Sequence, residues 1–431
     1  MGSGVTLTSG PAVFRPVQYL GSKLRSLDPI ERVIVADGAV GETVWEPFTG
    51  SSVVAQRLAA SGMRLVANDA LMSSATYAEA MLGVGRSEAD HDAADLIGLL
   101  SKSFEGDFGP WESAVSDEDA AVVSGNGDAL LAHGWGLPQR WKTQLGASAE
   151  EAPAGLLSST YAGTYFGLRQ ALELERLRGL VDELTRKERI DSWQRAVVLT
   201  AICSAASKAV FSAGKHFAQP LLVHARKSQA FHERRIVVDR RVDVISETYE
   251  AIRTVYIAAR SGWERHEASV ALAEHRTSED LRGQNVTTVY ADPPYTAQQY
   301  SRFYHVLEVL VEGVPADLQV RNGQVTRGLY PAERYKSPYC SRVQAPRAFR
   351  HLAEVAYDAG ARLVLSYSGS DAGSTGNPRS IEMTDLMSLL RDVFPLVHVE
   401  GLDLNYRQFN SAQSANAHRS DPEVLIVAET H

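Results

Sequence analysis

The chain has 431 residues, of which 44% are hydrophobic and 22% are charged, so it has the composition of a globular protein with a substantial core. Its length indicates one large domain with a sizeable insertion, or two domains. It contains no apolar run of the kind that spans a membrane, and its first fifteen residues do not resemble a secretory signal. Its two cysteines exclude a disulfide framework and give no zinc-type spacing. These features favour a cytoplasmic protein, and no metal site is expected.

The net charge of -9 is not typical of a nucleic-acid-binding protein, but the charge is unevenly spread. Residues 86–151 hold thirteen acidic residues and four basic ones. Residues 201–241 hold eight basic residues and two acidic ones, and residues 320–350 hold seven basic residues and one acidic one. Two local basic stretches are what contacts with phosphate groups require. Solvated surfaces without a ligand would explain them equally well.

Short apolar runs bounded by turn signals predict buried parallel strands, and helical patterns lie between some of them. This alternation predicts an α/β fold with a parallel sheet covered on both faces. In chain order the predicted elements are the strand Thr43–Trp45, the helix Ser52–Ser61, and the strands Arg64–Ala67, Ser269–Ala273 and Thr287–Tyr290; they continue with the helix Arg347–Ala359 and the strands Arg362–Ser366 and Glu423–Ala428.

The rhythm of strand and helix is absent between about Leu71 and His266. Apolar residues at helical spacing predict helices over Leu168–Thr185 and Trp193–Phe211. We therefore expect an α/β domain formed by residues 12–72 and 267–431, with a mostly helical domain inserted at residues 73–266. Residues 313–346 are rich in Arg, Tyr and Pro with little periodicity, which predicts a long surface loop.

The most informative motif is Asp292-Pro293-Pro294-Tyr295, directly after a predicted strand, where open α/β sheets bind their ligands. An aromatic amino group is a poor nucleophile because its lone pair is delocalised. The Asp292 carboxylate and the Pro293 carbonyl could each accept one N–H bond and localise that lone pair, while the prolines stiffen the turn. Tyr295 offers a face on which an extruded base could stack. A simple strand-ending turn is the alternative interpretation.

A turn of small residues, EPFTGSS at residues 46–52, follows the first predicted strand. Such a turn lets a ligand approach the backbone closely. It has neither the spacing of a P-loop nor the full dinucleotide pattern. It therefore suits a nucleoside with an amino-acid tail better than a pyrophosphate, although an ordinary turn would also explain it.

Two further motifs flank this turn. Asp69 ends the next predicted strand, where a carboxylate could accept hydrogen bonds from ribose hydroxyls or merely cap a helix. Upstream, the sequence YLGSK runs from Tyr19 to Lys23. In it, Gly21 would allow a ligand to come close, and Lys23 could hold the carboxylate of an amino-acid ligand.

In this order the motifs resemble those of the Dam-like, alpha-class N6-adenine DNA methyltransferases. The aromatic segment Tyr300–His305 also resembles the segment that follows the catalytic loop in that family, and the match covers roughly the first 70 and the last 165 residues. The resemblance implies a Rossmann-like class I methyltransferase sheet that binds S-adenosyl-L-methionine. It implies a catalytic role for Asp292, Pro293, Pro294 and Tyr295, and cofactor contacts from Tyr19, Gly21, Lys23, Glu46, Pro47, Phe48, Gly50 and Asp69.

Two departures and one open choice accompany the resemblance. Ser52 stands where the family usually has a second glycine, and the insertion is longer than in compact members. The family also has a residue near the cofactor adenine just before the catalytic strand. Glu274 or Asp280 could be that residue, and the sequence does not decide between them.

The resemblance also implies double-stranded DNA as a partner, with a cognate restriction or phage-defence component as a second candidate. The inserted region would recognise the bases, and the acidic stretch would face away from the duplex or contact another protein. In the second basic stretch the tyrosines could equally be packing residues. The predicted DNA contacts are Lys208, Lys215, His216, Arg226, Lys227, Arg234 and Arg235 in the first basic stretch, and Arg327, Arg334, Tyr335, Lys336, Arg342 and Arg347 in the second.

Three other functions compete with adenine methylation. Cytosine N4 methylation uses the same chemistry, although Asp292 argues against it because serine is expected there. RNA or a protein glutamine is a more distant substrate. A DNA-binding protein with an inactive methyltransferase core is the non-enzymatic alternative, against which the intact motif, Lys23 and Asp69 all argue.

Overall fold

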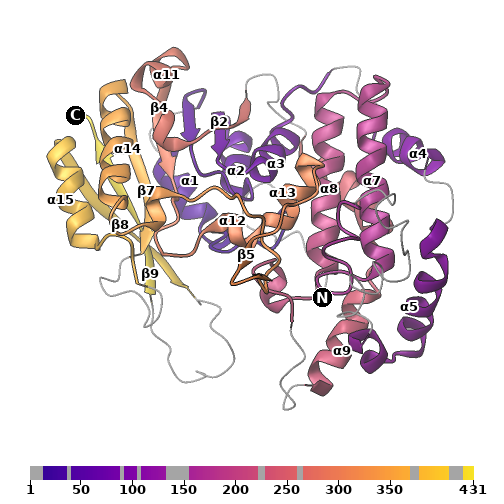
Figure 1. Cartoon of the computed structure of the whole chain (residues 1–431). Helices are drawn as coiled ribbons and strands as arrows, with labels where there is room; N and C mark the ends of the chain where they lie inside the picture. Colours follow the sequence, from indigo (N-terminus) through magenta and orange to yellow (C-terminus); the bar gives the residue numbers. More distant parts are fainter. Residues whose placement is uncertain are drawn as a thin grey trace.

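The computed structural model describes residues 13–35, 40–87, 92–103, 108–132, 155–221, 229–259, 266–368, 378–406 and 421–431. A sheet with its covering helices lies beside a group of long helices (Figure 1). None of the helices in these ranges is long and apolar enough to cross a membrane.

The central sheet has seven strands in the order β3-β2-β1-β4-β7-β9-β8. All pairs are parallel except those of β9, which runs antiparallel to both β7 and β8. The predicted α/β sheet is confirmed, most of its strands are parallel, and the strand order is compatible with a Rossmann-like fold. The run Glu423–Ala428, predicted as a parallel strand, belongs to β9 and is antiparallel to both of its neighbours. The strands are β1 (Thr43–Glu46), β2 (Arg64–Asp69), β3 (Glu267–Val270), β4 (Val286–Ala291), β7 (Arg362–Ser368), β8 (Leu396–Tyr406) and β9 (Asp421–Glu429).

Both faces of the sheet are covered, which explains why its central strands read as continuous apolar runs. Successive residues of one strand enter different cores: Val44 packs on one face of the sheet and Trp45 on the other. Helices α1 (Leu27–Ile34) and α2 (Val53–Ala60) cover the first face. The other face is covered by α11 (Ser278–Gly283), α14 (Ala345–Ala359) and α15 (Met383–Val393).

The described residues between β2 and β3 form helices and no strand of the sheet. α8 is buried around almost its whole circumference, as expected of a helix enclosed by others. It packs against α3, α7, α10 and α13, so the helical group shares one core with segments on both sides of it in sequence. The helices of this group are α3 (Met72–Leu82), α4 (Ala93–Ser103), α5 (Glu112–Ser124), α7 (Leu168–Arg186), α8 (Ser192–Ala209), α9 (Gln229–Arg240) and α10 (Val244–Ala258). The short helices α12 (Tyr300–Phe303) and α13 (His305–Glu312), which follow β4, pack beside them.

The structure differs from the sequence predictions in three other places. The third strand lies at Glu267–Val270 and not at Ser269–Ala273, because a 3₁₀ turn already begins at Ala273. β8 was not predicted, because an edge strand with exposed residues lacks a continuous apolar run. The segment 313–346 is more than a surface loop. It carries the hairpin β5–β6 (Val320–Arg321 and Gln324–Val325) and buries Tyr330 and Tyr339.

Candidate functional site

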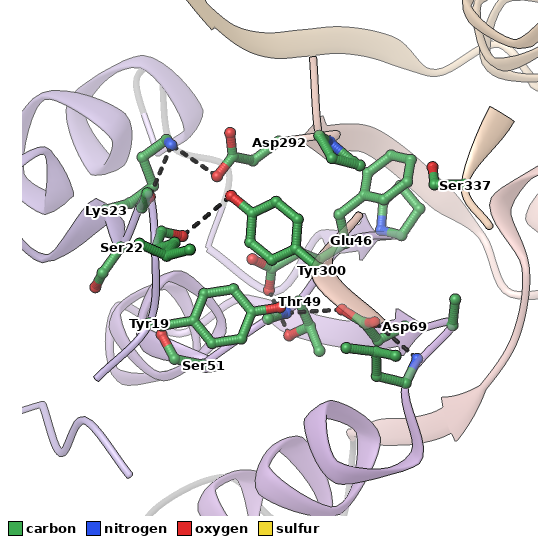
Figure 2. A pocket seen from close by; sticks show the side chains of 18 of the residues that line it. Tyr19, Ser22, Lys23, Glu46, Thr49, Ser51, Asp69, Asp292, Tyr300 and Ser337 are labelled. Atoms are coloured by element: carbon green, nitrogen blue, oxygen red, sulfur yellow. Dashed lines mark hydrogen bonds and ion pairs between the residues drawn. The ribbon is translucent and has the colours of Figure 1, made fainter. Parts of the chain in front are cut away.

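A cavity opens at the carboxyl ends of β1, β2 and β4, where the strand order reverses on the two sides of β1. It measures about 820 Å³ including the space at its open mouth, within the usual range for a site that binds a small molecule. The four predicted motifs meet there (Figure 2). Among the predicted residues, those that line it are Tyr19, Gly21, Lys23, Glu46, Pro47, Phe48, Gly50, Asp69, Asp292 and Pro294.

The turn after β1 is held against the end of β2 by backbone hydrogen bonds to Asp69. One carboxylate oxygen of Asp69 accepts from the Gly50 N–H and the other from the Leu71 N–H, each at 2.9 Å. Gly50 has a φ of 53° and lies under the ring of Tyr19, which a Cβ atom would approach to 2.9 Å. The turn therefore needs glycine both for its conformation and for the close approach of Tyr19. Burial raises the pKa of Asp69 to about 6, although the backbone donors oppose the rise.

Ser52, where the resembling family has glycine, adopts the left-handed conformation with a φ of 60°. Its side chain is fully buried, and its hydroxyl has no hydrogen-bond partner. The backbone at the start of α2 thus keeps the conformation that suits glycine, at a cost in free energy of about 1 kcal/mol.

Lys23 joins the YLGSK motif to the Asp-Pro-Pro-Tyr motif. Its ammonium lies 2.7 Å from Asp292 Oδ2 and 2.7 Å from Glu423 Oε1, and it donates to the Gly21 carbonyl at 3.0 Å. An ammonium has three N–H donors, so all of them are used within the protein. Lys23 lines the cavity, but to hold a ligand carboxylate, its predicted role, it would have to give up one of these bonds. Instead it fixes the carboxylate of Asp292.

Asp292 keeps one face toward the cavity. Its side chain is 21% exposed, and Lys23 is its one hydrogen-bonding partner within the described ranges, so Oδ1 accepts no bond. Burial raises the pKa of Asp292 to about 6; Lys23 opposes this rise, and the charge of Glu423 adds to it. Burial disfavours the charged form of Lys23, but the two carboxylates outweigh burial and hold its pKa well above the usual value. Asp292 is thus a carboxylate at neutral pH with a free acceptor oxygen.

Tyr19 and Tyr300 line the cavity, and Tyr304 packs against Tyr19. The rings of Tyr19 and Tyr304 stack with centroids 4.5 Å apart, and Tyr300 lies 5.5 Å from Tyr19. The Tyr300 hydroxyl donates to the Leu20 carbonyl at 3.1 Å, and the Tyr304 hydroxyl accepts from the Leu20 N–H at 2.7 Å. The segment after the Asp-Pro-Pro-Tyr motif therefore fixes the N-terminal motif against the cavity.

The charges of the cavity restrict the ligands that it can hold. Glu46, Asp69 and Asp292 line it, whereas Lys23 is the only Lys or Arg among its lining residues. Glu46 is almost completely buried and accepts a hydrogen bond from Thr49, and burial raises its pKa well above the usual value. A di- or triphosphate would meet net repulsion here. A ligand with a positive centre would be stabilised by the carboxylates and by the faces of the aromatic rings.

The tyrosine of the Asp-Pro-Pro-Tyr motif lies outside the cavity lining. The ring of Tyr295 packs against Tyr367 with centroids 4.9 Å apart, and the guanidinium of Arg379 lies 4.8 Å from its centroid. A base that stacks on Tyr295 would therefore share the ring with Arg379 or displace it. Pro293 is buried beside it.

The two candidates for contact with a cofactor adenine lie in different surroundings. Asp280 is exposed and caps the start of α11 through hydrogen bonds with Thr277. Glu274 accepts a hydrogen bond from the Tyr335 hydroxyl at 2.8 Å, and both Tyr335 and Ala273 line the cavity. The geometry favours Glu274.

The first basic stretch is largely neutralised within the protein. Lys208 pairs with Glu247, and both Lys215 and Arg235 pair with Asp239. Arg234 is exposed, His216 packs its ring against Phe303, and Arg226 and Lys227 lie outside the described residues.

The second basic stretch is more open. Arg334 is half-buried and lies over the ring of Tyr330, and the remaining predicted contacts in this stretch are Arg327, Lys336, Arg342 and Arg347, all exposed. Its tyrosines are engaged: Tyr330 and Tyr339 pack in the interior and Tyr335 bonds to Glu274.

The sequence analysis did not identify Glu423 or Arg379 as site residues. Glu423 lies in the antiparallel strand β9, about 400 positions from Lys23 in the chain, and no local pattern connects the two residues. A buried acid in an otherwise apolar strand was the available signal. Comparison with protein-family models and with curated proteins gave no match for this chain.

Proposed function

We propose that this protein is an S-adenosyl-L-methionine-dependent methyltransferase that modifies the N6 amino group of adenine in DNA. The observation that carries the proposal is the electronegative, aromatic-lined cavity at the carboxyl edge of the sheet, with the free oxygen of Asp292 in its wall. The Rossmann-like strand order and the order of the motifs along the chain support it.

The residues present fit this cofactor. Its sulfonium centre is a cation, which the carboxylates of Asp69 and Asp292 and the aromatic faces of the cavity favour. Asp69 would hold the ribose, the turn around Gly50 would admit the cofactor's middle, and Glu274 with Tyr335 would border its adenine. When bound, the cofactor supplies an electrophilic methyl group.

Asp292 would prepare the nucleophile. Its unbonded Oδ1 would accept one N–H of the target amine, and the Pro293 carbonyl would accept the other. Together the two acceptors would favour the tetrahedral nitrogen that carries a localised lone pair. Lys23 and Glu423 hold the carboxylate in place beforehand, so it need not reorganise during the reaction.

The proposal is tested by incubating the protein with S-adenosyl-L-methionine labelled in its methyl group and DNA of mixed sequence. The DNA is then hydrolysed and its nucleosides are analysed by mass spectrometry. We expect labelled N6-methyladenine. Labelled N4-methylcytosine would instead assign the protein to the cytosine enzymes, and cofactor binding without any labelled nucleoside would favour an inactive DNA-binding protein.

The variant Asp292→Ala links that activity to the cavity. We expect turnover to fall by at least about 100-fold, as for loss of a preorganised transition-state contact, while calorimetric affinity for S-adenosyl-L-methionine is largely retained. Asp358→Ala, which removes an exposed carboxylate on α14, is the matched control and should leave turnover unchanged. Near-normal turnover in Asp292→Ala would contradict the proposal.

A further inference from the structure

Two arginines converge on one buried tyrosine outside the cavity. Arg302 Nε donates to the Tyr330 hydroxyl at 2.8 Å, and its guanidinium carbon lies 5.4 Å from the centre of the Tyr330 ring. The guanidinium of Arg334 lies 4.7 Å from the same centre. Tyr330 is 8% exposed and donates in turn to the Ala218 carbonyl, so it forms a fixed platform for both cations.

The hairpin β5–β6 brings a third arginine to this platform. The Gln319 N–H donates to the Tyr330 carbonyl at 2.7 Å, and Leu318 forms a bridge with Pro331. Arg321 follows two residues later, beside the Asn-Gly turn that closes the hairpin, and it is exposed. Burial lowers the pKa of Arg334, Tyr330 opposes this, and the charges of Arg302 and Arg321 lower it further, so Arg334 lies within electrostatic range of both other arginines.

The fold does not neutralise this cluster. In the described part of the chain, none of the three arginines forms an ion pair, and Glu333, although adjacent to Arg334 in sequence, does not pair with it. Other arginines of the protein are paired, as Arg57 is with Asp28 and Arg169 with Asp119. Three crowded guanidinium groups repel one another, and a bound anion would relieve that repulsion.

The cluster lies next to the cavity wall on two separate segments. Arg302 directly follows Ser301, Arg334 directly precedes Tyr335, and both Ser301 and Tyr335 line the cavity. The Ser301 hydroxyl donates to the Tyr335 carbonyl at 2.6 Å, which ties the two segments together. A ligand that extends out of the cavity past this contact would meet the arginines.

We propose that Arg302, Arg321 and Arg334 form a phosphodiester-binding site for the strand that flanks a base bound at Asp292. Guanidinium groups bind phosphate oxygens in a bidentate manner, and a polynucleotide presents neighbouring phosphates that match several cations from different segments. This inference rests on the proposed function for the identity of the strand. It assigns Arg302 and Arg321 a binding role and places Arg334 with them.

The test measures how salt weakens binding of a fluorescent, mixed-sequence DNA duplex. The variant is Arg321→Gln/Arg334→Gln, which leaves the Arg302–Tyr330 hydrogen bond intact. We expect the slope of log K against log salt to become shallower by about 2, since each lost phosphate contact contributes about 0.9. The matched control is Arg32→Gln/Arg391→Gln, which removes two exposed charges from α1 and α15 and should leave the slope unchanged.

Further measurements separate the possible outcomes. The variant Arg321→Lys/Arg334→Lys should recover the salt slope but only part of the affinity, because lysine cannot bind bidentately or stack. An unchanged slope in the Gln variant, an equal loss in the control, or competition by polyglutamate as strong as that by unlabelled duplex would overturn the site. Calorimetry with S-adenosyl-L-methionine tests the proposed function separately. If the protein binds the cofactor but the Gln variant keeps the salt slope of the wild type, only this site is rejected. If the slope of the Gln variant becomes shallower but the protein does not bind the cofactor, this site is supported and the proposed function is rejected.

Discussion

The two basic stretches of the chain carry a similar excess of positive charge, yet the fold surrounds them differently. In the first stretch, Lys215 donates to the carbonyls of Lys208 and Val210 at 2.6 and 3.1 Å and pairs with Asp239, so its three donors are used at the end of α8. In the second stretch, Arg321 and Arg334 have no acidic partner in the described part of the chain. A cation whose donors are used within the protein stabilises the fold, and a cation left without a counter-charge is available to a ligand.

Lys23 lines the cavity, but like Lys215 it is a cation whose donors are all used within the protein. Its replacement should have the largest effect on turnover. Lys23→Met would leave Asp292 and Glu423 facing each other without a cation, so the pKa of Asp292 should rise above neutral pH. The protonated acid no longer presents a charged acceptor. We expect turnover at pH 7 to fall by at least about 100-fold, measured as label transferred to DNA.

A double variant shows whether this loss arises from charge or from general damage. Lys23→Met/Glu423→Gln removes the cation together with the second carboxylate, and it should regain part of the lost turnover. Lys187→Met, which breaks an exposed pair with Glu183, is the control and should behave as wild type. A double variant no more active than Lys23→Met would argue against an electrostatic role for Lys23.

Lys215 should affect stability and leave DNA binding unchanged. Lys215→Met removes the donor from two carbonyls at the end of α8 and one partner of Asp239, although Arg235 still pairs with that carboxylate. We expect the free energy of unfolding in urea to fall by about 2 kcal/mol, with the salt slope of DNA binding unchanged. If the slope instead became shallower by about 1, Lys215 would contact phosphate and the comparison of the two stretches would fail.

Glu423 provides a prediction about pH. Asp292 must be charged to act as an acceptor, so turnover should rise with pH through its pKa of about 6. The charge of Glu423 contributes to that raised pKa, and Lys23 divides its bonds between the two carboxylates. In Glu423→Gln the acid limb of the pH–rate profile should therefore move to lower pH. An acid limb that stays in place, or that moves to higher pH, would show that Glu423 does not act on Asp292 through charge.

The parts of the fold that the sequence predicts are those encoded locally. The apolar runs at β1, β2 and β4 and the periodicity of α7 and α8 need only neighbouring residues, and the structure confirms these elements. The edge strand β8 lacks such a signal because part of its surface is exposed. The meeting of the motifs at one site could likewise be predicted, because parallel strands bring their carboxyl ends to one edge of the sheet.

The partners of charged side chains could not be predicted, because they depend on contacts between distant segments. The sequence of the first basic stretch contains Lys215 and Asp239, but their pairing follows from how α9 packs against α8. In the same way, Arg302 lies outside both basic stretches, yet it completes the cluster around Tyr330. Charge counts therefore located two of the three arginines of this cluster and also several cations that the fold neutralises.

Ser52 tests how far an unpartnered polar group can be taken as a sign of a ligand. Its hydroxyl is buried without a hydrogen bond, but Ser52 is not among the residues that line the cavity. The residue also holds a φ of 60°, which glycine adopts without strain. Ser52→Gly removes both costs and loosens the unfolded chain, so we expect a net stabilisation of about 1 kcal/mol or less, measured in urea. Affinity for S-adenosyl-L-methionine should stay the same. If affinity fell while stability rose, the hydroxyl would contact the ligand, and Ser52 would belong with the unpaired arginines as a group held ready for binding.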